Sequence, residues 1–428
     1  MDDPVLKLSA EDQEKVRSWV PDPLVPPTPA DHPALNPVIV DGKLGKYVRV
    51  KSRDLLNMAS HNYLGMVGDA SVEAAGVAAL RKYGVGACGP RTFFGTVDVH
   101  LELEHHISAF LGTEETAIYS LGFSTVSSAI PAYAKPGDVL VVDESVHFAI
   151  QKGVQASKSK TVWFKHNDVE DLECQITRLM TELEKDLKPP PAAARLFIVV
   201  EGLYMNTGDI CPLPEVVALA QRHKIRIILD ESVSIGVLGE QGRGVTEHFG
   251  VKVTDVDLIC GSLEHALGSC GGFTSGSYHV VDHQRLNGLG YVFSASLPPM
   301  LASAATKALE LIDNDVTMTS RLRTVSETLH MALSAVEGLQ LVGVPESPIK
   351  HLRLATSGGK RSDDQQLLQR IVDIVRDEGV LLTTACYLAD QEVKTPPPSI
   401  RVIAAIYLLD EEIQLVKRAL DIAVAQVL

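Results

Sequence analysis

The 428-residue sequence lacks two features that would point to particular classes of protein, a long apolar run and a basic cluster. No stretch reaches the roughly 18 apolar residues of a bilayer-spanning helix, so we expect no such helix in this chain. The N-terminus, MDDPVLKLSAEDQEK, is acidic and polar, which does not fit a secretory signal peptide. The formal net charge of −15 argues against nucleic acid as a partner, because phosphate backbones are bound by clustered Lys and Arg.

Cysteine is also scarce, and its spacing is not that of a metal site. None of the six cysteines forms a Cys-x-x-Cys pair, and several lie in apolar surroundings. This pattern predicts that the cysteines are reduced thiols in a protein that faces the cytosol. It also predicts that the chain has no metal centre. Aromatic residues make up 5% of the chain, whereas 45% is hydrophobic and 22% is charged, a balance typical of a folded globular protein.

What the sequence does contain divides it into three predicted parts. Residues 1–45 are expected to form an extended arm, because several prolines follow a short helix that Ser9 could begin. Residues 46–313 alternate between helical segments and short apolar, β-branched runs, which is typical of parallel strands covered on both faces. Residues 314–428 predict a smaller α+β domain. A proline-rich surface loop is expected from Lys188.

The predicted fold is therefore α/β, with a doubly wound, mostly parallel sheet that carries its ligand site at the carboxyl ends of the strands. In the large part, strands are predicted at 139–142, 197–200, 225–229 and 256–260, and helices at 72–83, 99–110, 125–133, 169–187 and 213–223. In the small part, strands are predicted at 340–343, 349–354, 380–384 and 400–404, and a helix at 364–377.

Several candidate site residues follow these strands. Gly122 and Phe123 begin a helix whose free N–H groups could bind phosphate, although every helix start offers such groups. His147 comes after a strand and could cover a ligand, but a lone histidine is more often structural. Asp230 ends another strand, where its carboxylate could meet a cationic ring nitrogen or merely cap a turn.

The segment GSLEHALGSCGGF (Gly261–Phe273) follows the last of these strands and carries His265 at a position suited to a reactive side chain. Each of the four segments is a weak signal alone. In order, they offer a phosphate cradle, a cover for a planar ring, a carboxylate and a strand end. Together they indicate the layout of an enzyme that uses pyridoxal phosphate (PLP).

These segments resemble the α-oxoamine synthases, which are fold type I PLP-dependent transferases. In that family a histidine stacks on PLP, an aspartate pairs with the pyridine nitrogen, and a lysine after a Gly-Thr or Gly-Ser dipeptide forms the Schiff base. The resemblance implies that His147 is the stacking residue, Asp230 the pyridinium partner and Ser262 a phosphate contact. It puts His265 where the lysine of the family stands.

Longer motifs, spread over residues 9–428, are similar to the long-chain-base subunit 1 group of serine palmitoyltransferases. That subunit is the non-catalytic half of a heterodimer, and its partner, subunit 2, carries the lysine. The resemblance implies that the pair condenses L-serine with palmitoyl-CoA to 3-ketodihydrosphingosine, the first step of sphingolipid biosynthesis. The motifs include YGVGACGPR from Tyr83, GTVDVH from Gly95, VVEGLYMNTG from Val199, GEQGRGVTEH from Gly239 and FSASLPP from Phe293.

The missing lysine limits what this chain could do alone. In such enzymes a lysine amine holds PLP as an imine and then moves protons at the substrate. An imidazole forms no stable imine of this kind, and no lysine occurs between Lys252 and Lys307. We therefore expect no catalytic residue in this chain and no covalently bound cofactor. His147 and Asp230 nevertheless match the active enzymes, so the pocket is expected to keep some PLP-like shape.

In the family the active sites lie at the dimer interface, which implies roles for further residues. Ser294 and Ser296 stand in a segment that reaches the partner's PLP phosphate in relatives, although Ala295 replaces a threonine that several relatives have. Arg401 resembles an arginine near the substrate carboxylate, and a strand-end salt bridge is the equal alternative. Residues expected at the interface or near the substrate are Cys88, Arg91, Gly95 and His100.

The resemblance also implies partners and a location. The partners are subunit 2, a small activating subunit and ORM-type regulators, with serine and palmitoyl-CoA at a shared site. The location is the cytosolic face of the endoplasmic reticulum membrane. Two other functions stay open: a scaffold or regulatory pseudoenzyme that binds membrane partners, and an independent PLP enzyme with an atypical base.

Overall fold

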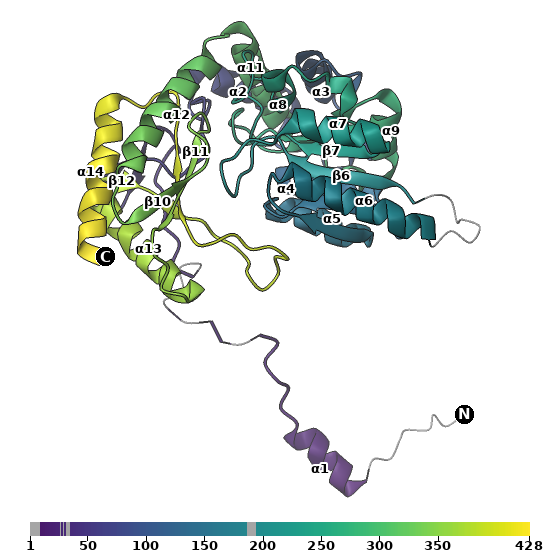
Figure 1. The fold of residues 1–428 in the computed structure, drawn as a ribbon. Helices are drawn as coiled ribbons and strands as arrows, with labels where there is room; N and C mark the ends of the chain where they lie inside the picture. The colour runs from purple at the N-terminus through teal and green to yellow at the C-terminus, as the bar shows by residue number, and fades with distance from the viewer. Residues whose placement is uncertain (1–8, 26, 29, 31–34, 186–193) are drawn as a thin grey trace. The chain divides into compact units, whose positions relative to one another are not determined.

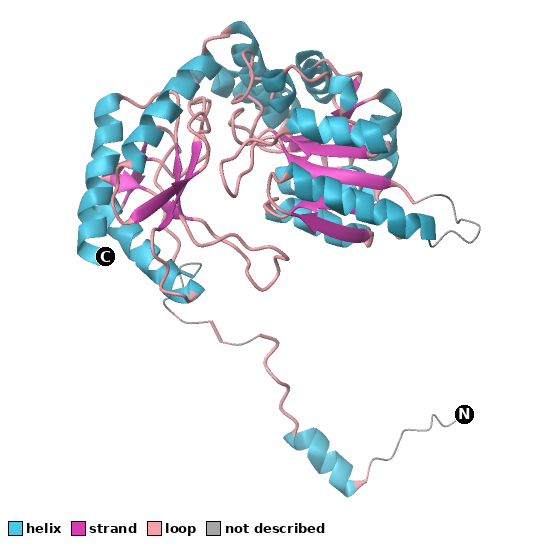
Figure 2. Cartoon of the chain, viewed as in Figure 1, coloured by secondary structure: helices cyan, strands magenta, loops and turns pink. Residues whose placement is uncertain are grey.

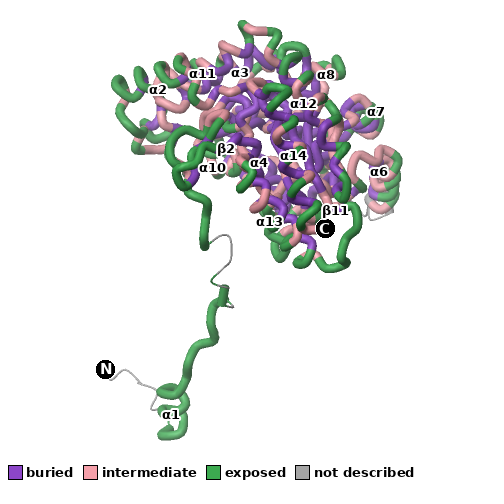
Figure 3. The backbone as a smooth tube through the Cα atoms, turned by 90° about the vertical axis from the view of Figure 1, so that its left-hand side faces the viewer, coloured by how far each residue is buried: buried purple, intermediate pink, exposed green. Residues whose placement is uncertain are grey.

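The computed structural model describes residues 9–25, 27–28, 30, 35–185 and 194–428. It divides into two units, Met1–Ile39 and Val40–Leu428. In the first unit, α1 (Ala10–Ser18) begins as predicted, because the Ser9 side chain accepts a hydrogen bond from the Asp12 backbone N–H at 3.1 Å. All of α1 is exposed (Figure 3). Among the described residues, no helix has the length and apolar character to cross a membrane.

The centre of Val40–Leu428 is a seven-stranded sheet with the order β3-β9-β8-β7-β6-β4-β5. Within it, β9 runs antiparallel to both neighbours and the other pairs are parallel, which confirms the mostly parallel sheet (Figure 2). Its strands are β3 (Glu115–Tyr119), β4 (Val139–Asp143), β5 (Lys160–Phe164), β6 (Leu196–Glu201), β7 (Arg226–Asp230), β8 (Leu258–Ser262) and β9 (Gly272–Gly276).

The sequence predicted β4, β6, β7 and β8 but missed the other three strands. The strand β9 reads GFTSG, a composition with poor intrinsic strand propensity. Its five residues are nevertheless all buried, and a Cβ on Gly272 would lie only 2.4 Å from Thr125 Oγ1. Glycine is therefore needed because the neighbouring helix packs directly on the strand, a tertiary cause that local pattern does not reveal.

Helices cover this sheet, and α6 and α7 lie across its strands in Figure 1. The helix at Leu213–His223 has the predicted bounds, and it buries Leu213, Val216, Val217 and Ala220 at helical spacing. The helices of this part are α2 (Ala70–Tyr83), α3 (Asp98–Leu111), α4 (Gly122–Tyr133), α5 (Phe148–Ser157), α6 (Val169–Lys185), α7 (Leu213–His223), α8 (Val245–Phe249), α9 (Tyr278–Asn287), α10 (Leu289–Val292) and α11 (Pro299–Asn314). The loop predicted from Lys188 lies almost wholly outside the described residues.

The C-terminal part contains an antiparallel sheet with the order β10-β11-β14-β13 and three helices. The strand predicted at 380–384 is wrong as one element, because its two halves pair in different sheets. The first half, β12, pairs with β2 (Arg53–Asn57), which itself pairs with β1 (Tyr47–Val50). The elements are β10 (Leu339–Val342), β11 (Ile349–Leu354), β12 (Val380–Leu381), β13 (Thr383–Thr384), β14 (Ile400–Ile403), α12 (Met318–Ser334), α13 (Arg361–Asp377) and α14 (Asp410–Val427).

The buried hydrophobic residues of Val40–Leu428 form two main clusters. One surrounds the seven-stranded sheet and runs through Ile312, and the other lies mostly between α12, α13, α14 and the small sheet. The second cluster also contains Leu56 and Met58, which come from the N-terminal side of the large part. The domain limits at 45 and 313 therefore stay a prediction.

Candidate active site

The carboxyl ends of the central strands meet at one edge of the sheet, as the parallel register requires. A cavity of about 280 Å³ lies there. Six of the residues predicted from the sequence line it, which are Gly122, Phe123, His147, Ser262, His265 and Arg401. Lining residues that the sequence did not single out are Phe148, Ala149, Met205, Asn206, Ser232, Glu264, His351, Ala385, Cys386, Tyr387 and Glu392.

His147 and Asp230 form a buried pair at this edge. The His147 Nε2 donates to Asp230 Oδ2 at 3.2 Å, and the His147 backbone N–H donates to Glu201 Oε1 at 2.6 Å. Burial lowers the pKa of His147, but Glu201 and Asp230 outweigh this effect and raise the pKa to about 9. Burial also raises the pKa of Glu201 to about 7. His147 Nδ1 accepts from the Ala149 backbone N–H at 3.3 Å, so this bond and the one to Asp230 together fix the orientation of the ring.

A second histidine nearby is held in the same way and gives a pH prediction. His166 Nδ1 lies 2.9 Å from Asp143 Oδ1 and its Nε2 lies 3.3 Å from Asp209 Oδ2. Burial lowers the pKa of His166, but the two carboxylates outweigh it and raise the pKa to about 9. Because the unfolded pKa is about 6.5, this stabilisation is complete below that pH and is lost as pH rises through the folded pKa.

We therefore expect His166→Gln to lower the free energy of unfolding by about 2 kcal/mol at about pH 6 and by much less at about pH 9.5. Urea denaturation of both proteins at the two pH values measures this difference, and other titrating groups cancel in the comparison. If His166→Gln lowers the free energy of unfolding equally at both pH values, His166 is not held as an imidazolium.

His265 follows the end of β8, and its ring lies close to two other aromatic rings. Its ring lies 4.9 Å from the ring of His61 and 6.3 Å from that of Tyr63, measured between centroids. Burial lowers the pKa of His265 to about 4, with help from the charge of His147. At neutral pH this position therefore carries a neutral imidazole, which offers neither an amine nor a positive charge.

Arg401 lies on β14 and lines the same cavity. Its Nε atom is buried without a hydrogen-bond partner, and within the described part of the chain no carboxylate pairs with it. Burial lowers its pKa. Among the described residues, the strand-end salt bridge that the sequence left open is thus not formed.

The start of α4 carries a carboxylate of the chain itself. The Gly122 backbone N–H donates to Glu264 Oε1 at 3.3 Å, and Leu121 at the N-cap supplies no side-chain hydrogen bond. Ser262 lies beside them, and its Oγ accepts from the Glu264 backbone N–H at 3.0 Å. A carboxylate of the chain therefore contacts the helix start that the sequence proposes as a phosphate cradle.

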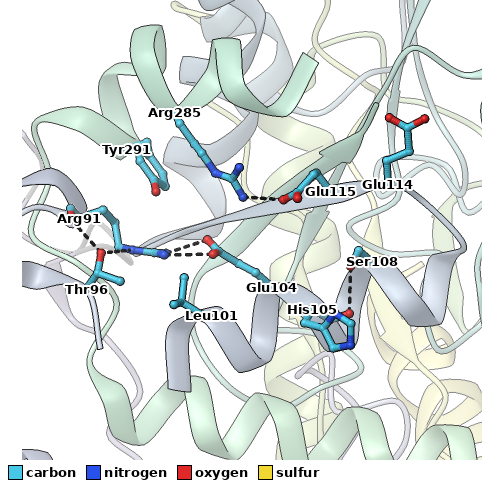
Figure 4. A pocket seen from close by; sticks show the side chains of 10 residues that line it. All are labelled: Arg91, Thr96, Leu101, Glu104, His105, Ser108, Glu114, Glu115, Arg285 and Tyr291. Atoms are coloured by element: carbon cyan, nitrogen blue, oxygen red, sulfur yellow. Dashed lines mark hydrogen bonds and ion pairs between the residues drawn. The ribbon is translucent and has the colours of Figure 1, made fainter. Parts of the chain in front are cut away.

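The other predicted residues gather elsewhere, around the loop before α3. Figure 4 shows Arg91 facing Glu104 at a second cavity, of about 480 Å³, with two hydrogen bonds of 2.8 and 3.0 Å between them. Ser296 lies against this loop, where its N–H and Oγ both donate to Gly89 O. The structure thus places Arg91 and Ser296 in contacts within the chain.

The four remaining predicted residues differ in how far they are buried and in what they contact. Gly95 is buried in the same loop, and Cys88 is exposed with a φ of 55°. His100 is fully buried and its Nε2 donates to Leu297 O at 2.7 Å, a structural contact. Ser294 Oγ lies 3.3 Å from Ser120 Oγ, next to the start of α4.

Sequence reasoning missed Glu264 and His351. Glu264 immediately precedes His265 in a segment already singled out, so a carboxylate beside a proposed phosphate site was a usable signal. His351 lies on a predicted strand but belongs to the small sheet, and its Nε2 donates to Met205 O at 3.0 Å. Only the packing of that sheet against the strand ends brings it to the cavity.

These residues fit a covalently bound PLP only in part. Asp230 supplies a carboxylate of the kind that a pyridinium nitrogen needs, but it is not among the residues that line the cavity and it contacts His147, which does line it. The imidazole of His265 supplies no amine, and the Glu264 carboxylate contacts the phosphate position. The crevice of this chain therefore does not fit the cofactor as an attached group.

Comparisons with known proteins identify the family. A family model described as aminotransferase class I and II matches residues 53–407. Long chain base biosynthesis protein 1 of Arabidopsis thaliana is 44% identical over 375 residues, which cover 88% of this chain and 77% of that protein. Serine palmitoyltransferase 1 of Dictyostelium discoideum is 41% identical over 413 residues, which cover 95% of this chain and 85% of that protein.

Solved structures give the same result. The serine palmitoyltransferase of Sphingomonas wittichii is 28% identical, with a TM-score of 0.81 over 98% of this chain and 96% of that chain. A high-resolution structure of SPT with a PLP internal aldimine has the same TM-score, identity and coverage. These matches confirm the fold type I architecture and PLP as the cofactor of the family. The chain belongs to the class I and II aminotransferase family and, within it, to the group of proteins named serine palmitoyltransferase 1 and long chain base biosynthesis protein 1.

Proposed function

We propose that this chain is the non-catalytic subunit of a serine palmitoyltransferase and works with a subunit 2 that carries the lysine. The observation that carries this proposal is His265, a neutral imidazole at the end of β8 in a segment without lysine from 253 to 306. The relatives named serine palmitoyltransferase 1 support the reaction, in which L-serine and palmitoyl-CoA give 3-ketodihydrosphingosine. The family's PLP supplies an electron sink, and the partner's lysine would hold it.

The contribution of this chain would come from side chains that reach a shared interface. Phe94 is fully exposed at the tip of the loop before α3, although it is a large apolar side chain. Ser294 lies beside the start of α4, close to the cavity edge. Arg401 has a free guanidinium edge that suits a substrate carboxylate. These side chains would bind and orient the substrates, while the proton-transferring amine would belong to the partner.

The remaining partners and the location belong to the proposal as well. The resemblance supports a small activating subunit and ORM-type regulators, and it supports the cytosolic face of the endoplasmic reticulum membrane. A second candidate function is a scaffold whose arm binds partners without shaping the catalytic site. Its support is the exposure of α1, which buries no residue of its own.

Co-expression with a lysine-bearing subunit 2 tests the proposal. We expect no product from either chain alone, and turnover of the complex to fall about tenfold for Ser294→Ala or Phe94→Ala, an effect typical of a lost interface contact. Ser334→Ala, an exposed serine in α12, is the matched control and should leave turnover unchanged. Full turnover in both test variants would favour the scaffold, and product from this chain alone would favour an independent enzyme.

A further inference from the structure

We infer that the carboxylate of Glu264, an exposed side chain, occupies the phosphate cradle of this crevice and keeps phosphate-bearing ligands out. This inference deepens the proposed function and rests on it, because it explains how the crevice stays free of a cofactor of its own. The loss of the lysine would then be one of two separate barriers, and the second would act on the phosphate rather than on the aldehyde.

Three groups converge on the N-terminus of α4. The Gly122 N–H donates to Glu264 Oε1 at 3.3 Å. A Cβ built on Gly122 would lie 3.1 Å from Glu264 Oε1 and 3.1 Å from Ser262 Oγ. The space directly in front of the first helical residue is thus bounded by a carboxylate oxygen and a hydroxyl, at contact distance.

The local structure directs the carboxylate to this place. Leu121 at the N-cap has no oxygen in its side chain, so it cannot accept the hydrogen bonds of the first turn. Ser262 Oγ accepts from the Glu264 backbone N–H at 3.0 Å, which holds the turn that leaves β8. A residue 142 positions away therefore supplies the acceptor that the helix start lacks.

The negative charge of Glu264 determines which ligands are excluded from the start of α4. A carboxylate is stabilised by the partial positive charge at a helix N-terminus, as a phosphate would be. A phosphate near neutral pH carries up to two negative charges, so it would both compete for the Gly122 N–H and be repelled by Glu264. Among the described lining residues, Arg401 is the one arginine or lysine, and it makes no ion pair with Glu264.

The experiment compares a phosphate-bearing ligand with the same ring lacking phosphate. His265→Lys restores an ε-amine that can condense with an aldehyde, forming an imine and releasing one water. In this background we compare Glu264→Gln with Glu102→Gln, a control that removes an exposed carboxylate on α3, outside this cavity. Absorbance titrations of the full 428-residue chain with PLP and with pyridoxal give the dissociation constants.

We expect Glu264→Gln to tighten PLP binding about tenfold or more while pyridoxal binding changes by less than about twofold. The control Glu102→Gln should change neither constant by that amount. Equal tightening of PLP and pyridoxal, or no change in either, would overturn the inference. Circular dichroism of each variant checks that it is folded.

A second measurement does not depend on the introduced lysine. With His265 in place, Glu264→Gln is expected to lower the dissociation constant for inorganic phosphate about tenfold, measured by thermal shift. An unchanged constant would overturn the inference. Neither measurement involves turnover or a partner subunit, so its result is distinguishable from a failure of the proposed function.

Discussion

Arg91→Ala is expected to lower the free energy of unfolding by about 3–5 kcal/mol, because it leaves a buried carboxylate without its counter-charge. The side chains of Arg91 and Glu104 are 5% and 6% exposed, and two hydrogen bonds of 2.8 and 3.0 Å join them. Glu104 Oε1 also accepts from the Ile118 backbone N–H at 3.0 Å. The pair thus ties the loop before α3 to β3, and its loss affects both.

Urea denaturation measures this cost, and Arg178→Ala provides the matched control. Arg178 pairs with Glu182 on the surface of α6, where the two side chains are 65% and 41% exposed, so its removal should cost less than about 0.5 kcal/mol. The double variant Arg91→Ala/Glu104→Ala should recover part of the loss, because no charge then stays buried alone. Similar small costs for Arg91→Ala and the control would contradict a buried ion pair.

Gly95→Ala is expected to cost more than about 3 kcal/mol, because the new Cβ has no space. It would lie 2.1 Å from Gly89 O, 2.6 Å from Pro90 O and 2.6 Å from Ser296 Oγ. Two of these atoms are backbone oxygens, so the loop itself must shift. Ser296 also donates to Gly89 O, and the shift would therefore disturb the segment that carries Ser294.

Gly86→Ala is the control for this variant, since Gly86 lies in the same region and a Cβ there meets no atom within 4 Å. We expect the control to unfold at nearly the wild-type urea concentration. If Gly95→Ala behaves as the control does, the close approach of the loop to Gly89 is wrong.

The sequence could predict the elements that local pattern determines. The strands β4 and β6 are continuous apolar runs, and α7 repeats its apolar residues at helical spacing, so both kinds were found. The strand β9 was missed because its small residues are selected by the close packing of α4, which only the folded chain reveals. The strand predicted at 380–384 divides because β2, more than 300 residues earlier, pairs with its first half.

The site shows the same limit. Residue order predicted His147 and His265 at strand ends, and the family resemblance added Ser262 and Arg401. All four line one cavity. Their charge states depend on neighbours that come from other strands, such as Glu201 beside His147. The contact between Glu264 and the start of α4 joins two distant segments, so the filled cradle could not be read from either motif alone.

The most direct test of the central claim is to find which chain holds the cofactor. The purified chain and its complex with a lysine-bearing subunit 2 are incubated with PLP, reduced with borohydride and mapped by mass spectrometry. We predict no stoichiometric pyridoxyl group on this chain in either sample and one such group on a lysine of the partner. A stoichiometric pyridoxyl group fixed on this chain would contradict the assignment of a non-catalytic subunit.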